Sequence, residues 1–119
     1  MSQPGPGATM QAVGFHDHGP IDNFELLEVP VPTIGADEVL VAVRAASLNH
    51  QDLFAIRELE HYVPDYPFWG GGDFAGEIAA IGENVTDWAV GDRVTVDPTI
   101  TCGTCRFCEA GEQSMCEDY

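Results

Sequence analysis

The chain has 119 residues, a length that fits one small domain able to bury roughly 65% of its unfolded surface. It carries 20 acidic residues against four arginines and contains no lysine, so its formal net charge is −16. Nucleic acids and anionic membranes are bound through clustered Lys and Arg, so this composition excludes both as partners. The sequence also lacks a run of about 20 apolar residues that could span a bilayer.

The acidic residues are spread along the whole chain. This pattern is typical of proteins that work in concentrated salt, where screening shortens charge repulsion to a few Å. We therefore predict a halophilic protein, with an ordinary acidic protein as the alternative. The N-terminus has no basic region, since the first positive side chain is Arg44, so a secretory signal is not expected. A cytoplasmic location follows, which favours metal or redox chemistry over disulfides for the cysteines.

The first elements are a tail and a strand. Residues 1–9 are rich in Pro and Gly and are predicted to form a flexible tail, with the domain proper at 10–119. A strand is expected over about residues 8–15. His16 and His18 then flank an Asp just before a Gly-Pro pair, which favours an exposed turn over a metal site.

Two further strands and a helix follow. Residues 24–32 read as an edge strand, because their prolines cannot donate to a sheet. Residues 37–47 alternate with period 2, which places Val39, Val41, Val43 and Ala45 on one face. At residues 47–60 the period changes to that of a short helix, with Ser47 or Asn49 as its cap and Asp52 in its first turn.

The remaining part before the cysteines is again rich in strands. Residues 61–73 are predicted to be a loop, and two strands are expected within residues 73–85 and 88–98, with turns at Gly82 and at Gly91-Asp92. Short strands at near-regular spacing with one brief helix indicate a mainly β fold, either a barrel or a sandwich.

The four cysteines of the chain lie together near its end. Cys102, Cys105, Cys108 and Cys116 have the spacing CxxCxxCx7C, and glycines between them allow a tight loop in which the sulfurs converge. Four thiolates at about 2.3 Å make a closed tetrahedral site for structural Zn²⁺. An iron–sulfur cluster is a weaker alternative because the fourth cysteine comes too late, and disulfides are a third. Backbone N–H donors, together with Arg106, are expected to offset the thiolate charge.

Three segments in order carry a family resemblance: "VLVAVRAASLNHQDL", "GGDFAGEIAAIGENVTDWAVGDRVTV" and "CGTCRFCEAGEQSMC". Together they resemble the N-terminal part of the medium-chain dehydrogenase/reductase superfamily, the zinc alcohol dehydrogenases and quinone oxidoreductases, over residues 10–116. The resemblance implies a GroES-like, partly open β-barrel with a short helix and a structural zinc lobe at 101–117, whose zinc ligands are the four cysteines. It also implies a Rossmann domain for NAD(P)H, for which these 119 residues have no GxGxxG motif.

The resemblance fails at the catalytic zinc. Where zinc alcohol dehydrogenases have a cysteine ligand this sequence has Asn49, and where they have the histidine of a GHE motif it has Gly72. An amide is a poor zinc ligand, and glycine has no side chain that could bind a metal. A catalytic zinc is therefore not expected. A replacement set of His50, Asp52 and Asp73 is conceivable, but structural roles for these aspartates are favoured.

The Asn in "SLNHQD" instead resembles the zinc-free quinone oxidoreductases, where an Asn lies in the nicotinamide pocket. Asn49 is therefore a catalytic candidate as a hydrogen-bond donor to a developing oxyanion or enolate, and Asp52 is a second candidate. The alternative for Asn49 is a helix cap that only orders the turn.

The expected function is the catalytic-domain portion of an NAD(P)H-dependent oxidoreductase that reduces a quinone, enone or carbonyl. Its partners would be this small-molecule substrate and a Rossmann domain beyond the chain, without which the 119 residues should not turn over. Surface left uncovered by that domain would favour association, including a homo-oligomer. The alternatives are a zinc-stabilised binding or scaffold module and a small iron–sulfur electron carrier.

Overall fold

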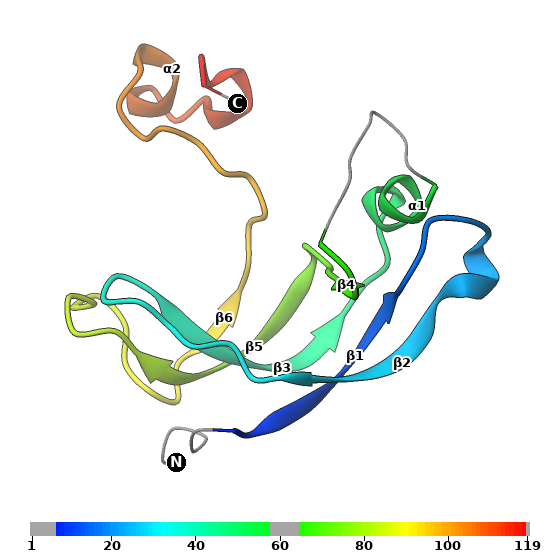
Figure 1. The fold of residues 1–119 in the computed structure, drawn as a ribbon. Helices are drawn as coiled ribbons and strands as arrows, with labels where there is room; N and C mark the ends of the chain where they lie inside the picture. Colours follow the sequence, from blue (N-terminus) through cyan, green and yellow to red (C-terminus); the bar gives the residue numbers. More distant parts are fainter. Residues whose placement is uncertain (1–6, 58–64, 119) are drawn as a thin grey trace.

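The computed structural model describes residues 7–57 and 65–118, which form two three-stranded antiparallel sheets with short helices (Figure 1). The strands are β1 (Thr9–Phe15), β2 (Glu25–Pro30), β3 (Val39–Ala46), β4 (Phe68–Trp69), β5 (Phe74–Ile81) and β6 (Arg93–Thr95). The helices are α1 (His50–Ile56) and α2 (Arg106–Glu109), and two 3-10 turns lie at Ile21–Asn23 and Gln113–Met115. Most of the predicted tail, residues 1–6, lies outside the described residues.

The first sheet has the strand order β2-β1-β4. Strand β2 is at its edge, as the prolines predicted, and pairs with β1 from Thr9↔Pro30 to Gly14↔Glu25. The prediction of a loop over 61–73 is wrong at β4, which pairs with β1 at Gly14↔Trp69 and Phe15↔Phe68. A strand of two aromatic residues between turn residues is too short to show the alternation that predicts a strand. Residues 61–64 of the predicted loop lie outside the described residues.

The second sheet has the order β3-β5-β6, and both predicted later strands are present in it. The strict alternation predicted for β3 is interrupted twice, because the pairing with β5 shifts between Leu40 and Val41 and again between Val43 and Ala45. Each shift changes the face that the next residues present. The predicted apolar face is therefore not buried as a unit, and the Val43 side chain is 55% exposed.

The core is centred on Phe15, which is fully buried at the end of β1. The rings of Phe24 and Phe68 lie with their centroids 5.6 and 5.3 Å from that of Phe15. His18 and Tyr66 pack on the same ring, and the Tyr66 hydroxyl lies 3.0 Å from His18 Nδ1. The prediction of an exposed turn is thus correct for His16 but wrong for His18, whose imidazole belongs to this aromatic cluster.

The molecule is open. Its radius of gyration is 16.2 Å, whereas a compact domain of this length has about 13.5 Å. Its accessible surface is 8818 Å², compared with roughly 6,300 Å² for a compact monomer of this mass. Several large apolar side chains are exposed as a result, among them Leu48 at 94% and Ile100 at 87%. None of the helices in the described part of the chain is long and apolar enough to cross a membrane.

Candidate functional site

The four cysteines lie in a small lobe that follows β6. Figure 1 shows this lobe, in orange and red, apart from both sheets and joined to β6 by an extended segment. Cys105 is the N-cap of α2, so Cys108 follows one turn later on the same helix. Gly103 and Gly111 have φ angles of 73° and 79°, which only glycine adopts readily, as the expected tight loop requires.

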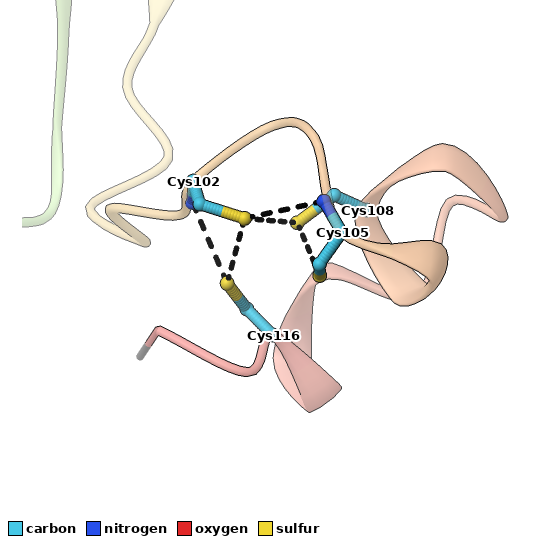
Figure 2. A group of neighbouring side chains, drawn as sticks. All are labelled: Cys102, Cys105, Cys108 and Cys116. Carbon is cyan, nitrogen blue, oxygen red and sulfur yellow. Dashed lines mark hydrogen bonds between the residues drawn. The ribbon is translucent and has the colours of Figure 1, made fainter.

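The structure brings all four predicted sulfur atoms together (Figure 2), all within 4.8 Å of one another. The Sγ atoms of Cys105 and Cys108 are 3.5 Å apart, those of Cys102 and Cys116 are 3.7 Å apart, and those of Cys102 and Cys108 are 3.9 Å apart. A tetrahedron with metal–sulfur bonds of about 2.3 Å has sulfur–sulfur edges of about 3.8 Å. The arrangement therefore fits Zn²⁺ with all four positions filled by protein.

Backbone N–H groups point at these sulfurs, as predicted. The N–H of Cys105 donates to Cys102 Sγ at 3.3 Å, and those of Cys102 and Asp118 donate to Cys116 Sγ at 3.4 Å each. Arg106 contributes differently from the expectation: its guanidinium lies 4.5 Å from the centroid of the Phe107 ring and pairs with Glu117 at 3.1 Å. Charge on the sulfurs is thus offset by the backbone.

The thiols differ in acidity because backbone N–H donors and desolvation act on them unequally. The backbone N–H groups of Glu117 and Cys108 lower the pKa of Cys105 to about 6. Desolvation, followed by the hydrogen bond with Cys105, raises the pKa of Cys108 to about 11. A divalent cation would bind the sulfurs as thiolates and displace the protons that they still carry.

The second group of candidates lies at the start of α1. Asn49 is the N-cap, which settles the choice between Ser47 and Asn49: its Oδ1 accepts the Gln51 N–H at 3.2 Å. Asp52 Oδ2 accepts the Asn49 N–H at 2.8 Å and completes a capping box. The Asn49 Nδ2 group also donates to Asp73 Oδ2 at 2.7 Å. Both predicted catalytic candidates are therefore part of the cap.

The geometry does not favour a metal at this second group. Gly72 has no side-chain ligand to offer, and a Cβ atom there would lie 3.0 Å from Pro98 Cβ, a contact that a small shift of the Pro98 ring would have to relieve. Within the described residues, the four cysteines are the one group of His, Cys, Asp and Glu side chains with metal-ligand spacing, and it does not include His50, Asp52 or Asp73. The carboxylates of Asp52 and Asp73 instead bind Asn49.

A shallow cavity of about 270 Å³ lies next to this cap, between the end of β3 and the start of β5. It is lined by Ala45, Ala46, Ser47, Asp73, Phe74 and Ala75. The sequence interpretation missed the contact between Asp73 and Asn49, which are 24 residues apart and share no local pattern. It also missed Pro98, whose position depends on the path of the chain after β6.

Residues 35–119 match the family model of the alcohol dehydrogenase GroES-like domain, and the chain belongs to this family. A sorbitol dehydrogenase of Bacillus subtilis is 44% identical over 92 residues, which are 76% of this chain and 26% of that protein. The cobalt- and zinc-bound alcohol dehydrogenase of Pyrobaculum aerophilum superimposes with a TM-score of 0.80 at 34% identity, over 92% of this chain and 33% of that one. The quinone oxidoreductase of Escherichia coli in complex with NADPH has a TM-score of 0.67 at 26% identity, over 72% and 26%.

These similarities confirm the medium-chain dehydrogenase/reductase superfamily and the mainly β, GroES-like fold. The chain spans about a quarter to a third of the length of these relatives. The parent family consists of dehydrogenases and oxidoreductases, and both the alcohol dehydrogenase and quinone oxidoreductase branches are among its structural neighbours.

Proposed function

We propose that this chain is the catalytic-domain portion of an NAD(P)H-dependent oxidoreductase that reduces a quinone, an enone or a carbonyl. The observation that carries the proposal is the Asn49 amide, which is held at the N-terminus of α1 beside the shallow cavity between β3 and β5. It occupies the position where a zinc-dependent relative would have a metal ligand. The NADPH complex of the E. coli quinone oxidoreductase supports the choice of cofactor.

The chemistry requires an oxygen of the substrate to gain negative charge. When held by the rest of the protein, NAD(P)H would supply a hydride to the substrate, and a proton from solvent would complete the reduction. Asn49 serves as a hydrogen-bond donor to the charged oxygen, and Asp52 fixes the Asn49 backbone through its 2.8 Å bond. A preorganised donor of this kind stabilises the transition state without having to move during the reaction.

The zinc is assigned a structural role. Cys102, Cys105, Cys108 and Cys116 would hold it, and a bound ion would cross-link the lobe to itself with no position left for a substrate. The lack of a metal-ligating side chain at Gly72 supports the proposal that no second zinc of the alcohol dehydrogenase type is needed.

The test uses the complete protein that contains this chain. Oxidation of NADPH and NADH is followed with a quinone, an enone and an aldehyde, and metal content is measured by mass spectrometry. We expect turnover with one zinc per chain, a fall in kcat of at least tenfold for Asn49→Ala, and no turnover by the 119-residue chain alone.

Other outcomes would assign a different function. A requirement for two zinc ions per chain would overturn the zinc-free mechanism. A folded protein that binds no dinucleotide would be a binding or scaffold module, and iron in place of zinc would make it an electron carrier.

A further inference from the structure

Asp73 joins two segments that are distant in the sequence. It immediately precedes β5, while Asn49 immediately precedes α1. The Asp73 carboxylate accepts from Asn49 Nδ2 at 2.7 Å, and the Asp73 carbonyl accepts the Ser47 N–H at 2.9 Å. One bond to a side chain and one to the backbone thus hold the connection between β3 and α1 against the start of β5.

The contact with Asp73 also decides how the Asn49 amide is oriented. A carboxylate only accepts hydrogen bonds, so Asp73 can pair with the nitrogen end of the amide and not with its oxygen. The Gln51 N–H only donates, so it must meet the oxygen end. Turning the amide over would place donor against donor and acceptor against acceptor. The two partners therefore leave one orientation.

One N–H bond of the Asn49 amide is left over. A primary amide has two, and in the part of the chain that the structure describes Asp73 is the acceptor found for this nitrogen. The Asn49 side chain is exposed, and the neighbouring cavity has a lining that is largely Ala and Phe. A hydrogen-bond donor next to apolar surface gains strength once a substrate excludes water from it.

We infer that Asp73 is a positioning residue, which orients the Asn49 amide so that its second N–H donates to the substrate oxygen. The inference rests on the proposed function, since it assigns that oxygen to the reduced quinone, enone or carbonyl. Asp73 does not touch the substrate itself. It acts by removing the rotational freedom of the donor before the reaction begins.

The experiment first removes the Asp73 side chain and then exchanges the residue types at positions 49 and 73, both in the complete protein. Asp73→Ala should lower kcat about tenfold while the Kd for NAD(P)H stays within twofold. In the double variant Asn49→Asp/Asp73→Asn, the carboxylate at position 49 still caps α1, and the amide at position 73 donates a hydrogen bond to that carboxylate. The melting temperature, lowered in Asp73→Ala, should therefore be close to the wild-type value. The kcat should remain low, because position 49 no longer carries an N–H donor.

A purely structural contact would behave differently. If it only holds two segments together, the reversed pair restores kcat along with the melting temperature, and the inference fails. It also fails if Asp73→Ala keeps the wild-type kcat. Asp87→Ala is the matched control, because this exposed aspartate lies in the turn between β5 and β6 and should leave both quantities unchanged.

A second measurement decides the contact without any turnover. Urea unfolding of Asn49→Ala, Asp73→Ala and the double alanine variant forms a thermodynamic cycle, in which we expect the double variant to lose clearly less stability than the sum of the single variants. Additive losses would show that the two side chains are not coupled and would overturn the inference. If the wild type reduces none of the substrates, the proposed function fails, while this cycle still decides whether Asp73 holds Asn49.

Discussion

Gly76 in β5 is a position where a single methyl group has no room. A Cβ atom there would collide with the carbonyl oxygen of Ala42 on the neighbouring strand β3 and with the Val41 side chain. Gly76→Ala should therefore push the two strands apart and destabilise the fold by about 1 to 3 kcal/mol. The measurement is urea unfolding followed by circular dichroism.

Gly35→Ala is the control for this prediction. A Cβ atom at position 35 would meet only the flexible end of the Glu38 side chain at 3.4 Å. The free energy of unfolding of this variant should therefore stay within about 0.5 kcal/mol of the wild-type value. Equal losses for the two variants would show that the close approach of β3 and β5 is not what excludes a side chain at position 76.

Residues whose partners are near in sequence were predictable, and those with distant partners were not. Asn49 and Asp52 form a cap because their spacing matches the first turn of a helix. The four cysteines form a cluster because the intervals between them are those of a metal site. The Asp73 contact with Asn49 and the packing of His18 on Phe15 depend on how separate strands come together. No local pattern encodes such contacts.

At the scale of elements, the cysteine lobe is expected to fold independently of the sheets. Among the residues that the structure describes, the hydrogen bonds of the lobe join residues within 101–118, and Figure 1 shows the lobe apart from the strands. Removing zinc with a chelator should therefore abolish amide protection in the lobe and leave the protection of β1, β3 and β5 unchanged. Hydrogen exchange with mass spectrometry makes this comparison directly.

Two variants separate the ligands of the lobe from its surface. Cys105→Ser removes one of four sulfurs and should abolish zinc retention during dialysis. Arg106→Ala should retain zinc like the wild type, because its ion pair with Glu117 is largely exposed and such pairs contribute about 0 to 1 kcal/mol. Loss of protection throughout both sheets on chelation would contradict the independence of the lobe.

Strands are harder to predict from the sequence where they are short or contain a β-bulge. Residues 9–15 and 25–30 have clear boundaries, whereas the two residues of β4 are recognisable as a strand only through their partners on β1. The shifts in β3 arise from its pairing with β5, and the pattern of β3 alone does not contain that information.

At the scale of the whole molecule, the charge of −16 is hardly compensated within the chain. Arg44 pairs with Glu77 and Arg106 with Glu117, and the acidic residues outnumber the arginines five to one. Raising KCl from 0.1 to 2 M shortens the screening length from about 10 Å to below about 3 Å. We therefore expect the midpoint of urea unfolding to rise markedly with salt.

Urea is the denaturant of choice here because it adds no ions of its own. Equal midpoints in dilute and concentrated KCl would contradict a halophilic protein and favour an ordinary acidic one. A salt effect that weakens at acidic pH, where carboxylic acids as a class lose their charge, would identify carboxylate repulsion as its cause.

The pairing of β4 with β1 also bears on the order of folding. Strands β1 and β2 are neighbours in the sequence, so their hairpin can form early, whereas the pairing of β4 with β1 joins segments that are distant in the sequence and should form later. Until then the second edge of β1 offers unpaired backbone groups to any other strand. Strand β4 covers the Gly14–Phe15 end of that edge, and variants that delay its arrival should aggregate during refolding before they lose native stability.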